Sequence, residues 1–270
     1  MLPSATSSKA KKRRLDQLLV LRGLVPSRER AMRLILSGSV LVDGERRSKP
    51  GQLVSADSAV ALLNRPPYVS RGGEKLIHAL KSFRITVNDR ACLDIGASTG
   101  GFTHCLLLQG ASRMYAVDVG KGQLDQRLRN DPRVVVMDET NARFLVPEDF
   151  APRPTLATVD VSFISLEKVL GAVAACLDEP GEVIALVKPQ FEVGRGQVGK
   201  GGVIRDPIKH RRVLSRVVEF AIGSGLSVLG LTASPLRGPK GNREFFVHLS
   251  RRGESVQGLE EQISDVVNAG

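Results

Sequence analysis

The sequence predicts an α/β fold, a mostly parallel seven-stranded sheet covered by helices, preceded by a small α+β domain. From Arg90 onward, short apolar segments of strand length alternate with segments of helical spacing. This alternation is typical of parallel sheets with helices on both faces. Before Arg65, two short helical patterns are instead followed by short strands. Pro66-Pro67 separates the two regions, because consecutive prolines neither continue a helix nor pair in a central strand.

The first region begins with small, polar and then basic residues, which predict a disordered leader. Leucines at helical spacing predict a helix near Leu15 that ends at Gly23, and a second helix from Ser27 to Gly38. A short strand is expected at Val40–Val42, followed by a hairpin turn at Asp43-Gly44; Val54 and Ala59–Leu63 are expected to supply the closing strand. We therefore divide the chain into a leader at 1–12, a small domain at 13–64, a linker at 65–68, a large domain at 69–252 and a C-terminal tail at 253–270.

In the large domain, a helix over Val69–Ser82 is expected to precede the sheet. The strands are expected at Cys92–Ile95, Met114–Val117, Val134–Met137, Leu156–Val159, Val183–Val187, Leu226–Leu231 and Phe245–Leu249. The helices between them are expected at Phe102–Leu108, Gln123–Leu128, Leu166–Cys176 and from Asp206-Pro207 to Gly223. Asp206 and Pro207 are a helix cap followed by a first-turn proline.

The positive charge of the chain is concentrated near its N-terminus. The net charge is +11, and residues 1–90 hold 18 of the 39 basic but only 7 of the 28 acidic side chains. That segment therefore carries the whole excess, which is typical of regions that bind polyphosphate. A solubilising surface is the alternative interpretation of such an asymmetry.

The run RLDQLLVLRGLVPSRERAMRLILSGSVLVDGE resembles the S4 RNA-binding domain over about fifty residues. The resemblance implies contacts to folded RNA, chiefly through its backbone. Cations at the expected helix starts and after the hairpin are candidate RNA contacts, and each could also be an ordinary surface cation. The candidates are Lys12, Arg14, Arg28 and Lys49.

The cysteines and the hydropathy limit the class of protein. Cys92, Cys105 and Cys176 form no CxxC pair and the histidines are scattered, so we expect neither a metal site nor a disulfide framework. Unpaired thiols suit the cytoplasm. The start of the chain lacks the apolar segment of a secretory signal, and no apolar run approaches the ~20 residues that cross a bilayer. We expect a cytoplasmic protein without a membrane partner.

A glycine-rich turn follows the first expected strand of the sheet, in the run LDIGASTGGF from Leu93 to Phe102. Glycines there let the backbone approach a ligand at the carboxyl ends of the strands. Acidic residues end the next strands, where they could bind an adenosine or cap a helix. The run resembles a class I methyltransferase, which implies S-adenosylmethionine as cofactor. The expected cofactor-binding residues are Asp94, Gly96, Ala97, Ser98, Gly100, Gly101, Phe102, Asp118, Asp138 and Asp160.

Four charged residues stand near strand ends or just before the sheet: Lys75, Asp160, Lys188 and Glu244. Methyl transfer to a hydroxyl requires an in-line geometry and a base that removes the proton. Lys188 ends an apolar strand before a proline, and desolvation with a neighbouring cation frees a lysine lone pair. We therefore expect Lys188 to be the base and Lys75 the neighbouring cation that orients the oxygen. Asp160 and Glu244 would hold the two ammonium groups, although all four could be structural ion pairs.

In order and position the four match the Lys-Asp-Lys-Glu set of FtsJ-like ribose 2′-O-methyltransferases. The runs SRGGEKL, RNDPRVVVMDETNAR, DVSFISL, LVKPQFEVG and PLRGPKGNREFF are similar to the TlyA (haemolysin A-like) family over nearly the whole chain. The resemblance implies 2′-O-methylation of cytidine in 16S or 23S ribosomal RNA. Glu74, before Lys75, and the segment after Leu249 depart from the pattern.

Three other functions remain open from the sequence. A membrane-active haemolysin would need a spanning or amphipathic segment, which is not visible. A non-catalytic RNA-binding or ribosome-assembly factor would not need every expected catalytic residue. A pseudouridine synthase would need neither the glycine-rich turn nor the two lysines. The expected partners are ribosomal RNA or ribosomal subunits, and nothing requires more than a monomer. The glycine-rich stretch Phe191–Arg205 is either a loop that closes over RNA or a plain connection.

Overall fold

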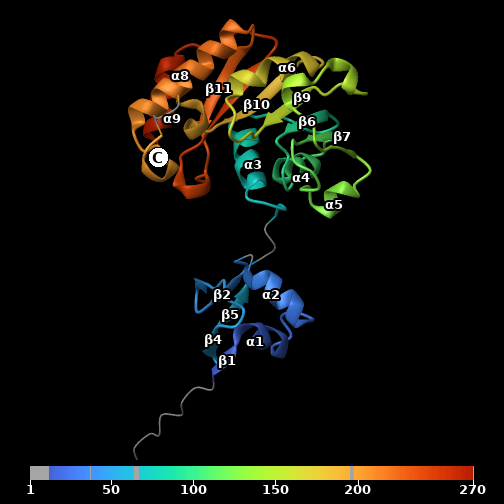
Figure 1. Ribbon diagram of the computed structural model, residues 1–270, viewed down its shortest axis with the longest axis vertical. Coiled ribbons are helices and arrows are strands. Elements are labelled where there is room, and N and C mark those ends of the chain that lie inside the picture. The colour runs from blue at the N-terminus through green and yellow to red at the C-terminus, as the bar shows by residue number, and fades with distance from the viewer. Residues whose placement is uncertain (1–11, 37, 64–66, 195–197, 270) are drawn as a thin grey trace, which may run out of the picture. The chain divides into compact units, whose positions relative to one another are not determined.

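The computed structural model describes residues 12–36, 38–63, 67–194 and 198–269. The chain forms two compact units, Met1–Pro67 and Tyr68–Gly270 (Figure 1). Most of the predicted leader, and residues 64–66 at the predicted linker, lie outside the described residues.

The first unit packs two helices against short strands around a small apolar core. The core includes Leu15, Leu18 and Ile35, each no more than 1% exposed. The elements are β1 (Lys12–Arg14), α1 (Leu15–Leu21), α2 (Arg28–Leu36), β2 (Val40–Val42), β3 (Glu45–Arg46), β4 (Leu53–Ser55) and β5 (Val60–Leu62). The helices and the strand at Val40 confirm the sequence analysis.

Two strand pairings complete the first unit. β2 pairs with β3 and β5, and Asp43 and Gly44 form the predicted hairpin turn with φ of 51° and 82°. β1 was not predicted. Lys12–Arg14 pair antiparallel with β4 instead of starting the first helix. A three-residue strand has no periodicity of its own, so its partner in the chain decides it.

The second unit contains a seven-stranded sheet in the order β11-β12-β10-β9-β6-β7-β8. Only β12 runs antiparallel to its neighbours, so the predicted mostly parallel α/β sheet is confirmed. The strands are β6 (Ala91–Ile95), β7 (Arg113–Val117), β8 (Val134–Met137), β9 (Leu156–Val159), β10 (Glu182–Val187), β11 (Ser227–Ala233) and β12 (Phe245–Ser250).

Helices cover both faces of this sheet (Figure 1). The helices of this unit are α3 (Gly72–Ser82), α4 (Gly101–Leu108), α5 (Gln126–Arg129), α6 (Leu170–Cys176), α7 (Pro189–Glu192), α8 (Pro207–Gly223) and α9 (Leu259–Asn268). Leu93 and Ile95 of β6 pack with the helices α6, α8 and α9, whereas Cys92 packs with α3 and α4. The period-two alternation of the strands therefore builds two cores.

The start of α8 agrees with the prediction, whereas α5 and α3 each begin three residues later than expected. Asp206 accepts a hydrogen bond from the Ile208 amide and Pro207 begins α8, as predicted. α5 begins only after its cap Asp125, three residues later than expected. α3 begins at Gly72, so the first three residues of the predicted helix lie outside it.

The segment 253–270, expected to be a tail, contains α9. Ile263 and Val267 are 1% and 2% exposed and belong to the core beneath α8. The sequence analysis did not assign this helix, although Leu259, Ile263 and Val267 stand at helical spacing; contact with β11 and α8 decides its burial.

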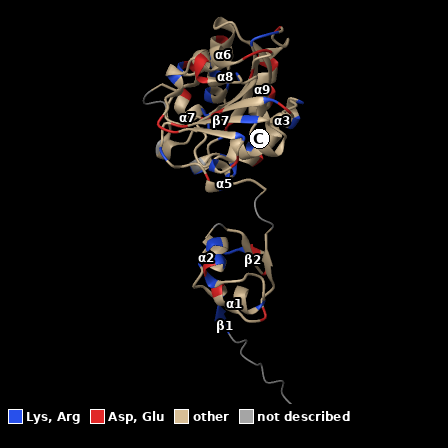
Figure 2. Cartoon of the chain, turned by 90° about the vertical axis from the view of Figure 1, so that its right-hand side faces the viewer, with Lys and Arg blue, Asp and Glu red and all other residues tan. Residues whose placement is uncertain are grey.

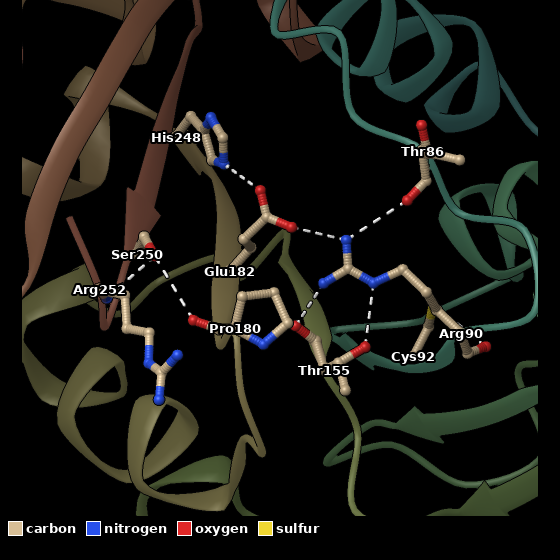
Figure 3. A network of polar contacts seen from close by, with 9 residues as sticks. All are labelled: Thr86, Arg90, Cys92, Thr155, Pro180, Glu182, His248, Ser250 and Arg252. Atoms are coloured by element: carbon tan, nitrogen blue, oxygen red, sulfur yellow. Dashed lines mark hydrogen bonds and ion pairs between the residues drawn. The ribbon is translucent and has the colours of Figure 1, made fainter.

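Polar contacts join four strands at the amino end of the parallel sheet (Figure 3). Glu182 begins β10 and accepts hydrogen bonds from Arg90 Nη1 at 2.6 Å and from His248 Nε2 of β12 at 3.0 Å. Arg90, directly before β6, also donates to the side chain and carbonyl of Thr155, directly before β9. We call Arg90, Thr155, Glu182 and His248 the strand-start cluster. This cluster lies where the parallel strands begin, at the end of the sheet opposite their carboxyl ends.

Within the part of the chain that the structure describes, no helix combines the length and apolar character needed to cross a membrane.

Candidate functional site

A cavity of about 620 Å³ opens at the carboxyl ends of the parallel strands. Its walls come from the turn after β6, the residues that follow β9 and β10, the start of α3 and the loop before β12. Open α/β sheets bind ligands at this edge, because the loops there converge from different strands. The cavity is therefore the candidate site of the second unit.

The glycine-rich turn lines this cavity. Gly96 has φ of 80°, and a Cβ there would lie 2.6 Å from the carbonyl oxygen of Asp160. Gly101 approaches the start of α3 closely, since its Cβ would lie 3.1 Å from Gly72 Cα. Only glycine fits these two positions. Five of the predicted cofactor-binding residues in this turn line the cavity: Gly96, Ala97, Ser98, Gly101 and Phe102.

Asp94, a predicted cofactor-binding residue, does not line the cavity, and its contact with a cofactor remains a prediction. It is fully buried, and its carboxylate accepts bonds from the Thr103 amide at 2.8 Å and the Thr158 hydroxyl at 2.9 Å. Burial raises the pKa of Asp94 to about 6. Its contacts fix the first turn of α4. At Gly100, also a predicted cofactor-binding residue, a Cβ would meet the side chain of Leu128.

Asp118 and Asp138 end β7 and β8 as predicted, but neither lines the cavity. Asp118 accepts hydrogen bonds from the amides of Ser98 at 2.8 Å and Gly120 at 2.7 Å. Asp138 forms an ion pair with Arg129, which holds the pKa of its carboxyl below its usual range. Both carboxylates thus shape the turns beside the cavity, and binding of an adenosine by them remains a prediction.

Two ion pairs stand inside the cavity, and together they contain the four predicted catalytic residues. Lys75 Nζ lies 2.6 Å from Glu244 Oε2, and their side chains are 9% and 0% exposed. Lys188 Nζ lies 2.7 Å from Asp160 Oδ1, with side chains 11% and 23% exposed. All four line the cavity. Burial of charges is costly unless they are paired, so these pairs differ from ordinary surface contacts.

Three further side chains of the cavity were not predicted as site residues. Ser162 Oγ accepts a hydrogen bond from Lys188 Nζ at 2.9 Å. Phe163 is 91% exposed with φ of 65°, and its ring centroid lies 4.9 Å from that of Phe191. The sequence offered a weak signal, since these residues directly follow Asp160 and Lys188. It gave no sign that an apolar Phe163 would face solvent.

The candidate RNA contacts of the first unit divide into two kinds. Arg14 and Arg28 both form ion pairs of 2.9 Å with Asp16, whose side chain is fully buried. Hydrogen bonding by Arg14, and then by Arg28, lowers the pKa of Asp16 to about 2. These two arginines therefore also stabilise the fold. Lys12 and Lys49 are exposed, and the blue segments of Figure 2 mark basic residues on β1 and α2. Lys49 also lines a surface hollow with Arg46 and Arg47.

Comparison with known proteins places these features in a class. The FtsJ-like methyltransferase family matches residues 68–251, and the S4 domain matches residues 13–60. The fold, the glycine-rich turn and these matches define an S4-domain methyltransferase of the FtsJ-like class.

Individual relatives are similar along nearly the whole chain. TlyA of Mycobacterium tuberculosis, named a 16S/23S rRNA (cytidine-2′-O)-methyltransferase, is 47% identical over 97% of this chain and 99% of the relative. Hemolysin A of Brachyspira hyodysenteriae is 41% identical over 87% and 98%. The solved structure of a hemolysin-named protein from Streptococcus thermophilus has 44% identity and a TM-score of 0.76, covering 96% of both chains. The chain belongs to the TlyA (haemolysin A-like) family of FtsJ-like methyltransferases.

Proposed function

We propose that this protein transfers a methyl group from S-adenosylmethionine to the ribose 2′-hydroxyl of a cytidine in ribosomal RNA. The observation that carries the proposal is two ion pairs in one cavity with the glycine-rich turn: the buried pair Lys75–Glu244 and the half-buried pair Lys188–Asp160. The name of the Mycobacterium tuberculosis relative supports the reaction and the substrate. With this substrate, we place the protein in the cytoplasm and propose that it acts as a monomer.

The residues of the cavity fit such a cofactor. Gly96 and Gly101 bring the backbone close to a ligand, and the Asp118 carboxylate lies beside Ser98 at the same turn. We propose that this turn holds the amino acid portion and that Asp118 and Asp138 bind the adenosine. When bound, S-adenosylmethionine supplies a methyl group already activated by a sulfonium sulfur. Asp94 contributes indirectly, by fixing the start of α4.

Removal of the hydroxyl proton is then the task of the chain itself. Lys188 Nζ is our candidate acceptor, since Asp160 and Ser162 fix its position at the cavity wall. Lys75, held by Glu244, supplies a second positive charge that orients the 2′-oxygen and stabilises it as the proton leaves. To accept the proton, Lys188 Nζ must present a lone pair to the hydroxyl when it arrives.

The first unit supplies RNA affinity in this proposal. We propose that phosphates are contacted by Lys12 and Lys49. Arg14 and Arg28 would join them where their ion pairs with Asp16 allow. At the cavity, the exposed ring of Phe163 offers a surface on which a base can stack.

The test is transfer of labelled methyl from S-adenosylmethionine to ribosomal subunits from a strain that lacks the enzyme, followed by nucleoside analysis. We expect 2′-O-methylcytidine from the wild type. Lys188→Ala should abolish transfer while cofactor binding, measured by calorimetry, stays largely intact. Lys81→Ala, at an exposed lysine of the helix that carries Lys75, is the matched control and should keep full activity.

The other outcomes separate the remaining possibilities. Methylation of a base would retain the methyltransferase class and reject the proposed roles of the two lysines. Full activity of Lys188→Ala would reject Lys188 as the base. Cofactor binding without transfer to either subunit would favour a different RNA substrate or a ribosome-assembly function.

A further inference from the structure

Glu192 is a buried carboxylate that the proposed reaction does not use. It belongs to α7, four residues after Lys188, and is 3% exposed. Its Oε2 accepts a hydrogen bond from Ser165 Oγ at 2.7 Å, and its Oε1 accepts one from the Leu166 amide at 2.9 Å. Burial raises the pKa of Glu192. An ionisable group in such a place is costly, so its contacts must supply compensating stabilisation.

These contacts join two segments that both line the cavity. On one side, α7 carries Phe191 next to Glu192 itself. On the other side, residues 161–166 carry Ser162 and Phe163, which lie directly before the two groups that Glu192 accepts from. Glu192 itself does not line the cavity. Any influence on the reaction must therefore pass through its neighbours.

The conformation of the 161–166 segment requires such support. Phe163 has φ of 65°, in the left-handed region that bulky residues rarely adopt, and its ring is 91% exposed. Strained backbone of this kind persists only where the surrounding structure fixes it. Leu166, 1% exposed, and Ser165 anchor the segment on its C-terminal side, and both are bonded to Glu192.

A second charged residue reinforces the junction from α8. Arg216 lies 2.8 Å from Glu167 Oε1 and 3.6 Å from Glu192 Oε2. Its side chain is 46% exposed, so the Glu167 pair is an ordinary partly exposed contact. The bonds to Ser165 and Leu166 are the ones made to the segment that carries Ser162 and Phe163.

We infer that Glu192 is a positioning residue: it holds the 161–166 segment so that Ser162 stays bonded to Lys188 and Phe163 stays beside Phe191 at the cavity. This role adds a positioning residue to the proposed function, and its expected effect on kcat rests on that proposed function. The alternative is that Glu192 stabilises the fold alone, with no consequence for the site.

The experiment compares Glu192→Ala and Glu192→Gln with Glu167→Gln as a matched control. Glu167→Gln removes the neighbouring ion pair of Arg216 but leaves the bonds of Glu192 to Ser165 and Leu166. Three quantities are measured: kcat and KM for methyl transfer per cofactor-binding site, the Kd of S-adenosylmethionine, and hydrogen exchange of the peptide 161–168. The exchange measurement needs no substrate.

We expect Glu192→Ala to lose exchange protection in 161–168 and to lower kcat by about 10–100-fold, the effect of a displacement of about 1 Å at a reacting group. Its cofactor Kd should stay within about twofold, because Glu192 makes no contact with the glycine-rich turn. Glu192→Gln keeps an acceptor for the Leu166 amide, as a weaker neutral bond, and should recover most of both losses. Glu167→Gln should match the wild type in all three.

Unchanged exchange protection in Glu192→Ala overturns the inference. So does a wild-type kcat per binding site in that variant, since Glu192 would then stabilise the fold only. A parallel loss of cofactor binding and turnover also overturns it, because the defect would be general. If the wild type transfers no methyl group to RNA, the proposed function fails, whereas the exchange result still decides whether Glu192 holds the segment.

Discussion

Glu182→Gln should destabilise the second unit without touching the cavity. Glu182 joins Arg90 and His248 in the strand-start cluster, and the side chains of Arg90 and Glu182 are only 16% and 18% exposed (Figure 3). The substitution keeps the shape of the side chain but removes its charge. Arg90 would then be left half-buried without a counter-charge. Most of the destabilisation from breaking such a pair comes from the charge that stays behind uncompensated.

The pKa of Glu182 gives the magnitude. The hydrogen bond from His248, with the Arg90 guanidinium, lowers that pKa from 4.5 to about 2. At about 1.36 kcal/mol for each pH unit, this difference corresponds to about 3 kcal/mol of stabilisation of the folded state. For a unit of this size the loss should lower Tm by about 10 °C.

The pH dependence provides a second, independent signature. The folded-state pKa of Glu182 is lowered, so its stabilisation is complete above pH 4.5 and is lost as pH falls toward about 2. The wild type should therefore exceed Glu182→Gln in stability by the full amount at neutral pH. The gap should narrow as the pH is lowered through about 4 toward about 3.

The assay is urea unfolding of both proteins across this pH range, with Glu139→Gln as control. Glu139 pairs with Lys121 at 2.9 Å, but both side chains are well exposed, so its loss should cost less than about 1 kcal/mol. Equal stability of Glu182→Gln and the wild type at neutral pH would refute the reasoning. A gap that does not narrow on acidification would show that charge pairing is not its origin.

Three further perturbations test other parts of the structure. Asp16→Asn should destabilise the first unit by about 1–3 kcal/mol at neutral pH, because Arg14 and Arg28 lose their shared counter-charge; thermal unfolding of that unit measures it, and no change would mean the arginines are independent of Asp16. Ile263→Ala should cost about 2–5 kcal/mol in urea unfolding, since a side chain 1% exposed leaves a cavity; a cost near zero would indicate that α9 is detached from the core. Burial raises the pKa of Asp94 to about 6, so the wild type should gain stability against urea as pH falls from about 7 to about 5. Asp94→Asn should lack that gain. Identical pH profiles of the two proteins would show that Asp94 is not its source.

Local patterns were sufficient for most of the fold. Apolar residues such as Leu93 and Ile95 were sufficient to predict the strands, because the two-residue period of side-chain direction is a property of the strand itself. The Asp206-Pro207 start of α8 and the Asp43-Gly44 turn were predicted because capping and turn preferences act between near neighbours. The same holds for the glycine-rich turn, whose φ values and close approaches demand glycine.

Tertiary structure decided the features that depend on partners far away in the chain. Lys75 and Glu244 are separated by 169 residues; the sequence singled out both charges, but which lysine pairs with which carboxylate depends on the fold. The strand at Lys12–Arg14 and the burial of α9 also depend on distant partners, as does the pairing of Arg14 and Arg28 with Asp16.

The surroundings of individual residues near the site were decided in the same way. Asp94 stands in the predicted turn, yet burial and its bonds to Thr103 and Thr158 turn it away from the cavity. Phe163 is apolar, yet its segment is fixed from Ser165 and Leu166 so that its ring faces solvent. The sequence by itself determined the order of the elements and which strand ends carry charge. Packing decided which of those side chains meet in the cavity. The burial of a side chain and its ion-pair partner both depend on residues far away in the sequence, which a local pattern does not include.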